Sequence, residues 1–137
     1  MSSAGLDDEE GSAAVEFALI APFLLLILLG IMVASIYLAT LLAVSNTAIE
    51  AARATIPGMT TAERSNLATA RANAIFTAYS PFLDVSKVTV APADNGANTF
   101  RVQVSYNLSD FGFTGLIARM GLPTQVARTV VVANGGF

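Results

Sequence analysis

The sequence predicts an α+β fold with a long N-terminal transmembrane helix, a second amphipathic helix and a small antiparallel sheet. Three observations support this. Residues 17–42 are almost wholly apolar, residues 62–79 have the spacing of a helix with one apolar face, and residues 88–106 alternate with a period of two. Helices followed by a run of strands are typical of an α+β domain.

The N-terminal helix is predicted from its length and lack of charge. No charged residue occurs between Phe17 and Ile49. A bilayer core needs about 20 apolar residues in a helix, so this stretch can cross it with some tilt. No Lys or Arg precedes Arg53, and the apolar run is too long for an ordinary cleaved signal peptide.

The helix is expected to run from Ser12 to about Ile56. Ser12 is a suitable N-cap, and Pro22 is expected to cause a mild kink that a membrane helix tolerates. Pro57-Gly58 is the first clear helix breaker, so the last turns should project beyond the bilayer. Residues 1–11 are small and acidic and are expected to form a flexible tail.

A second helix is expected from Ala62 to Tyr79. Thr60-Thr61-Ala62-Glu63 has the spacing of a capping box, and Ser80-Pro81 ends the pattern. Its apolar face is predicted to consist of Leu67, Ala70, Ala74 and Ala78, with Ile75 beside them.

The remaining residues predict a three-stranded sheet. Asp94-Asn95-Gly96 supplies the turn of a hairpin whose second strand alternates apolar and polar residues, and Thr124–Ala133 is the third strand. A short helical turn is expected at Thr114–Met120. Three strands are marginal alone, so the sheet must pack on a helix. A late apolar cluster is expected either to seal the core or to face lipid or a partner; it consists of Phe111, Phe113, Leu116, Ile117, Met120 and Leu122.

Composition argues against several functions. The chain has no Cys and no His, which removes thiol nucleophiles, disulfides and the commonest zinc ligands. No nucleophile-base pair, paired carboxylates or phosphate loop can be found, so we predict no enzyme activity, no cofactor and no metal. The seven Lys and Arg are scattered singly, which argues against a nucleic-acid partner.

The N-terminal stretch carries a family resemblance. Gly11-Ser12-Ala13-Ala14-Val15-Glu16-Phe17, followed by Ala18-Leu19-Ile20-Ala21-Pro22 and the apolar run, resembles the N-terminus of TadE-like proteins, the minor pseudopilins of tight-adherence (Tad/Flp) pilus systems. The resemblance implies a pseudopilin-like fold and a role in pilus assembly. It extends in order to the small-residue stretch around Glu50 and Arg53, the hairpin and the last strand.

The resemblance also implies roles for three residues. A prepilin peptidase would cut between Gly11 and Ser12, and Glu16 would become the fifth residue of the mature chain. Its carboxylate would then pair with the new α-amine of a neighbouring subunit and fix the axial register. The alternative for Glu16 is a solvated carboxylate at the headgroup level without an assembly role.

Two functions remain open at this point. The first is a non-catalytic TadE-like minor pseudopilin in the bacterial inner membrane, with an acidic leader (1–11), a transmembrane and projecting helix (12–57) and a periplasmic domain (58–137). The second is an uncleaved single-pass accessory subunit of another membrane complex. In either case the partners are the lipid bilayer and other subunits, and Gly30 and Ala34 form a small-xxx-small pair where another helix can approach.

Overall fold

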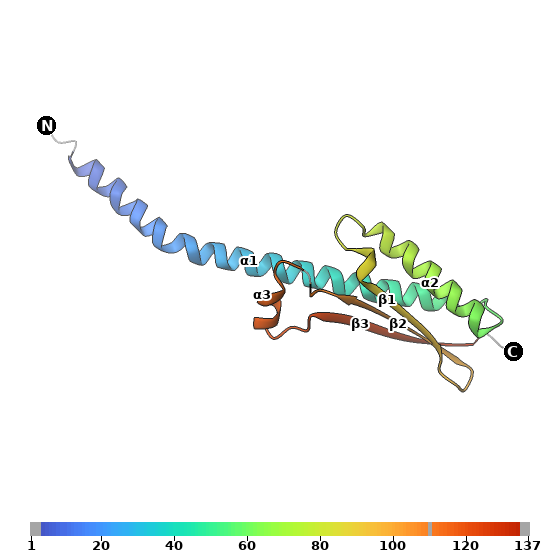
Figure 1. The fold of residues 1–137 in the computed structure, drawn as a ribbon. Helices are drawn as coiled ribbons and strands as arrows, with labels where there is room; N and C mark the ends of the chain where they lie inside the picture. Colours follow the sequence, from blue (N-terminus) through green and yellow to red (C-terminus); the bar gives the residue numbers. More distant parts are fainter. Residues whose placement is uncertain (1–3, 110, 135–137) are drawn as a thin grey trace. The chain divides into compact units, whose positions relative to one another are not determined.

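The structure, a computed structural model, describes residues 4–109 and 111–134, with side chains from Glu9 onward. Figure 1 shows its elements in chain order: α1 (Ala4–Ala54), α2 (Thr61–Ala78), the single 3-10 turn η1 (Val85–Lys87), β1 (Val88–Asp94), β2 (Thr99–Asn107), α3 (Thr114–Arg119) and β3 (Gln125–Ala133). The predicted α+β fold is confirmed, including the short helix before the last strand.

Helix α1 begins earlier than the sequence predicted. It starts at Ala4, so Ser12 lies inside the helix and is not its N-cap, and the described part of the expected flexible tail is helical. The backbone of the acidic run 7–10 is helical as well. A single glycine at position 11 costs only about 1 kcal/mol and does not stop the helix. Residues 1–3 lie outside the described residues.

The chain forms two compact units, Met1–Ile36 and Tyr37–Phe137. The first unit is the N-terminal part of α1, most of whose large apolar side chains are exposed: Phe17 and Phe23 are each 67% exposed, whereas Val33 is buried. Among the described residues, α1 is the one helix long and apolar enough to cross a membrane. This fits the predicted transmembrane helix.

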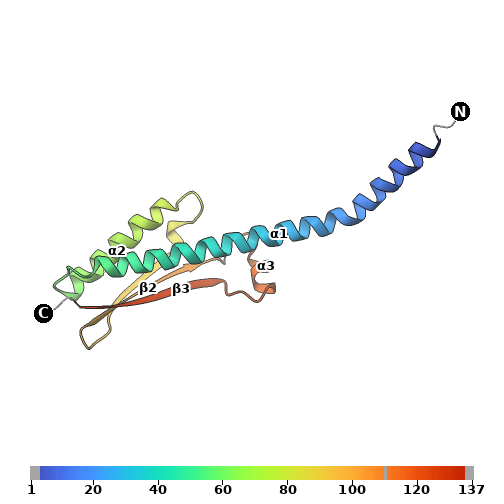
Figure 2. The ribbon, with the colours of Figure 1, turned by 180° about the vertical axis from the view of Figure 1, so that it is seen from behind.

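The second unit is built around the sheet β1-β2-β3, in which both pairings are antiparallel (Figure 2). The central strand β2 alternates as predicted: its buried side chains are Phe100, Val102, Val104 and Tyr106. Pro92 lies in β1, an edge strand, where its missing N–H does not interrupt the sheet. The sheet packs on helices, as a sheet of three strands requires.

The buried face of α1 in this unit consists of small residues. Thr40, Ala43, Val44, Thr47, Ala48, Ala51 and Ala52 are all at most 1% exposed. Small side chains let neighbouring elements approach the helix axis closely. These residues make the surface through which α1 contacts the rest of the unit.

The predicted apolar face of α2 is wrong. Its buried residues are Ala68, Ala72 and Phe76, while Ala70, Ala74 and Ala78 are exposed. Phe76 decides the orientation because it is the largest apolar side chain of the helix. Its ring stacks on that of Tyr106, with the centroids 5.8 Å apart, and the buried face lies about 150° around the helix from the predicted one at 100° per residue.

The connection between α1 and α2 is fixed by specific hydrogen bonds. The Thr60 hydroxyl accepts from the Glu63 N–H at 3.2 Å, and the Glu63 carboxylate accepts from the Met59 N–H at 2.9 Å. This confirms the predicted capping box, with Met59 in place of Thr60 as the reciprocal donor. The Arg64 Nε donates to the Gly58 carbonyl at 2.8 Å.

The predicted hairpin turn is also present. Gly96, Ala97 and Asn98 have positive φ angles of 72°, 47° and 58°. The Asp94 carboxylate accepts from the Gly96 N–H at 3.0 Å and holds the turn. The turn lies at the end of the sheet where α1 ends and α2 begins (Figure 1).

Candidate functional site

The Gly11–Ser12 peptide bond lies in helical, exposed backbone. Both residues are exposed, and a Cβ added to Gly11 would meet nothing within 4 Å. A peptidase that binds its substrate in an extended form must therefore unwind this turn. Glycine lowers the cost because it is among the weakest helix formers.

Glu16 lies one helical turn after Ser12. Residues four apart share one helix face, so a new amine at Ser12 would lie on the same face as the Glu16 carboxylate. Glu16 is exposed, and the described residues offer it no ion-pair partner within the chain. The carboxylate is available to a group outside the chain.

Gly30 and Ala34 also lie one turn apart on α1. A Cβ added to Gly30 would meet nothing within 4 Å, so the chain itself does not use the space that this glycine leaves. Large exposed side chains surround it along the helix, among them Ile27 and Ile31. Gly30 and Ala34 are both half-buried, and the helix-packing role of this small-xxx-small pair stays a prediction.

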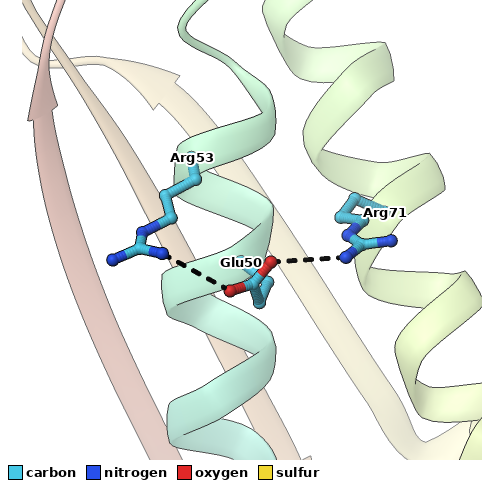
Figure 3. A network of polar contacts seen from close by, with 3 residues as sticks. All are labelled: Glu50, Arg53 and Arg71. Atoms are coloured by element: carbon cyan, nitrogen blue, oxygen red, sulfur yellow. Dashed lines mark hydrogen bonds and ion pairs between the residues drawn. The ribbon is translucent and has the colours of Figure 1, made fainter.

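A polar network links α1 to α2 in the second unit (Figure 3). Glu50 faces Arg53 at 3.8 Å and Arg71 at 3.3 Å. The sequence predicted the i,i+3 pair with Arg53, but Arg71 comes from another helix and could not be foreseen. All three side chains are at least 40% exposed, so the network contributes little to stability and helps to align the two helices.

The described residues contain no group of His, Cys, Asp and Glu that could hold a metal ion. The late apolar cluster is divided. Ile117 is buried, Phe111, Phe113, Leu116 and Leu122 are half-buried, and Met120 is exposed. The cluster therefore contributes in part to the core and in part to the surface.

These features fit a single-pass, membrane-anchored α+β protein with an exposed polar signal before its apolar helix. Comparison with known proteins makes this more specific: residues 11–53 match the family described as TadE-like protein. The match begins at the predicted cleavage glycine and ends at Arg53, which confirms the resemblance over this segment. Its extension to the hairpin and the last strand stays a prediction. No curated protein and no solved structure matches the chain.

The family match relates the chain to Tad pilus systems and, in general terms, to pilus subunits. The TadE-like family is a structural, pilus-associated family that is not known for enzymatic activity. The matched segment contains Gly11, Ser12, Glu16, Gly30 and Ala34. Most of the Tyr37–Phe137 unit lies beyond it.

Proposed function

We propose that this chain is a non-catalytic TadE-like minor pseudopilin that supports Tad pilus assembly from the bacterial inner membrane. The TadE-like match over residues 11–53 carries the proposal, because it joins the Gly11/Glu16 signal to the apolar helix. In this function the helix anchors and packs the subunit, and residues 58–137 face the periplasm.

The exposed faces of α1 support an assembly role. The first compact unit presents the Glu16 carboxylate, for which the described residues hold no ion-pair partner, open space at Gly30 and large apolar side chains. A neighbouring pilin helix would offer an α-amine to Glu16 and a surface that can approach closely at Gly30.

One observation favours the alternative of an uncleaved accessory subunit. Helix α1 continues without a break through Gly11 into the acidic segment, so the leader and the anchor form one element. In that case the acidic turn would dock on a basic surface of a partner subunit.

Intact mass of the protein purified from its native membrane separates the two functions. The pseudopilin proposal expects the loss of residues 1–11, with Ser12 as the new N-terminus. A Gly11→Leu variant should retain the longer chain, and because nothing in the fold fills the space at Gly11, the substitution should leave folding unchanged. A full-length mass in cells that carry the peptidase would instead support the accessory subunit.

A second experiment tests Glu16. Glu16→Ala should leave membrane insertion intact and reduce incorporation into assemblies by about tenfold or more, since an unpaired terminal amine would remain in a low-dielectric contact. Glu16→Gln is the matched variant that keeps the size and removes the charge. Normal co-purification of both variants with the partner subunits would assign Glu16 to the solvated headgroup level.

A further inference from the structure

The loop that joins α2 to η1 presents one large apolar side chain to solvent. Phe82, in the loop 80–85, is 81% exposed. The loop is held on both sides of this residue: the Phe82 N–H donates to the Tyr79 carbonyl at 2.9 Å, and the Asp84 N–H donates to the Tyr106 hydroxyl at 3.0 Å. Because the loop is already ordered, little conformational entropy is lost when a partner binds the Phe82 ring.

The same loop carries a carboxylate beside this ring. Asp84 is exposed and lies two residues after Phe82, so their Cα atoms are at most about 7 Å apart. The hydroxyl and the N–H of Ser86 donate to the Asp84 carboxylate and lower its pKa, so the group is ionised at neutral pH. The 80–85 loop therefore offers an aromatic ring and a negative charge together.

A groove between α1 and β3 has the complementary character. Its volume is about 340 Å³. The lining side chains include Tyr37 and Leu41 on the α1 side and Pro123, Val126 and Arg128 on the β3 side. Neither ion pair within the described residues includes Arg128. The groove thus combines apolar walls with a positive charge that the described residues do not neutralise.

The 80–85 loop and the groove lie on opposite sides of the Tyr37–Phe137 unit. The loop leads through η1 into β1, whereas the groove lies at β3, and these strands are the two edges of the sheet. Figures 1 and 2 show the loop after α2 on one side of α1 and β3 on the other. The loop therefore does not fill the groove of its own copy, and both surfaces are left for other molecules.

The loop and the groove lie at the same level of the sheet. Asp84 bonds to Tyr106 of β2, and Tyr106 is paired in register with Val126, which lines the groove. A second copy shifted sideways, without being turned end over end, brings its loop to the groove of the first. Both copies then keep Tyr37, the first residue of the unit, at the same end, as two copies anchored in one membrane require.

We propose that a second copy of this chain docks on the α1–β3 groove, with its Phe82 ring between the apolar walls and its Asp84 carboxylate on Arg128. The contact is head-to-tail, because each copy uses its loop on one side and its groove on the other, so it can continue from copy to copy. An aromatic anchor in a pocket, beside a charge pair, is typical of the few residues that carry most of the binding energy.

Each surface also has a simpler explanation. Single exposed apolar residues are normal on protein surfaces, and a charge on an edge strand protects it from pairing with another chain. Neither explanation accounts for a ring with a carboxylate at the same level as a groove with a cation. The contact is small and therefore weak alone, but anchoring in one membrane gives the copies a high effective concentration. It requires anchoring and does not require cleavage after Gly11.

Disulfide crosslinking of the full chain in native membranes tests the contact, because the chain contains no Cys. Pro81→Cys places a thiol beside Phe82, and Ser45→Cys places one in the groove. The two variants are expressed together with different tags and treated with a mild oxidant. Crosslinks should join the two variants to each other and should not join copies of one variant. Homodimers as abundant as the mixed dimer would overturn the head-to-tail contact.

Further substitutions in these variants remove the recognised groups. Phe82→Ala in the Pro81→Cys copy should slow crosslinking at least about tenfold, as expected for an interface anchor. Asp84→Arg in that copy, or Arg128→Asp in the Ser45→Cys copy, should slow it by a similar factor because like charges then meet. Combining the two charge reversals should restore the rate, which also shows that both variants fold. Failure of the combined reversal to restore crosslinking would overturn the proposed charge pair.

Two matched controls separate this contact from general surface effects. Met59→Ala removes another large apolar side chain, which is 86% exposed, and Arg101→Asp reverses a charge at an exposed position of β2. Both should crosslink at the unsubstituted rate. An equal loss in the controls would reduce the effect to surface apolarity or net charge and end the proposal. Intact mass reports cleavage separately, so failure of this contact is distinguishable from failure of the pseudopilin function.

Discussion

Two stretches of helix α1 differ in how far their side chains are exposed to solvent. Between Phe17 and Ile36, α1 carries Phe, Leu and Ile side chains that are mostly more than half exposed. Between Tyr37 and Ala54, one face consists of Thr, Ala and Val that are fully buried. The backbone is helical throughout. The difference is therefore one of surroundings: the first stretch is suited to lipid, and the second to close contact with protein.

The comparison explains how one helix with no charged residue between Phe17 and Ile49 can have two functions. Large apolar side chains are compatible with lipid, because lipid tails are equally apolar. In lipid there is therefore no hydrophobic driving force to bury these side chains in protein. The second stretch gains stability when α2 and the sheet exclude water from it, and small residues permit the approach. Substitutions in the two stretches should therefore have unequal effects on folding.

The largest expected difference is between two phenylalanines. Phe76→Ala removes a fully buried ring that stacks on Tyr106, and should lower the free energy of unfolding of the Tyr37–Phe137 unit by about 3–5 kcal/mol. Phe23→Ala, in the exposed stretch, should leave it unchanged. Urea unfolding in micelles, followed by the near-ultraviolet circular dichroism of the tyrosines, measures both. A similar loss in both variants would mean that the first stretch is also part of the folded core.

A smaller effect is expected from adding volume to α1. Ala48 is fully buried, so Ala48→Leu should cost about 1–3 kcal/mol by overpacking the contact with the neighbouring elements. Ala39 is exposed on the same stretch, and Ala39→Leu should change the free energy of unfolding by less than about 0.5 kcal/mol. Equal tolerance at the two positions would show that this face of α1 is loosely packed.

The sequence predicted what depends on local patterns and missed what depends on contacts between distant residues. The hairpin turn, the capping box and the alternation of β2 follow from neighbouring residues, and all three are present. The face of α2 was missed because alanines on several sides of a helix give no strong period, and the decisive contact of Phe76 is with a strand 30 residues away.

The candidate site shows the same division. Gly11, Ser12 and Glu16 were recognised because their spacing is local, and the family match includes them. The start of α1 at Ala4 was missed because a small, acidic segment without apolar periodicity was assigned to a tail, whereas its described backbone is helical. A groove lined by Tyr37 of α1 and Arg128 of β3 could not be predicted at all, since these residues are about 90 apart in the chain.

Two buried threonines separate the effect of packing from that of hydrogen bonding. The Thr47 hydroxyl is buried without a hydrogen-bond partner, whereas the Thr55 hydroxyl donates to the Ala52 carbonyl at 2.7 Å. Thr47→Val should therefore stabilise the unit by about 1 kcal/mol, and Thr55→Val should destabilise it by a similar amount. Thermal unfolding of both variants measures the signs. Destabilisation by Thr47→Val would show that this hydroxyl is satisfied by a group such as a buried water.

The smallest effect concerns pH, and it arises outside both stretches. No Asp, Glu, Lys or Arg lies between Phe17 and Ile49, so the dependence of folding stability on acid pH must come from outside that segment. Asp84 is one such group: the hydroxyl and the N–H of Ser86 donate to its carboxylate at 2.7 and 2.9 Å and lower its pKa, with a further contribution from Lys87. Because the pKa of Asp84 is lower in the folded state, its ionised carboxylate stabilises the fold at pH values above the unfolded pKa, about 4. This stabilisation is lost as the pH falls through the folded pKa.

Ser86→Ala removes the hydroxyl donor and should move the pKa of Asp84 back toward its ordinary value, measured by carboxyl NMR titration. Because Asp84 is exposed, the change in stability should be small at any pH. An unchanged pKa in Ser86→Ala would assign the shift to the backbone N–H and Lys87 alone.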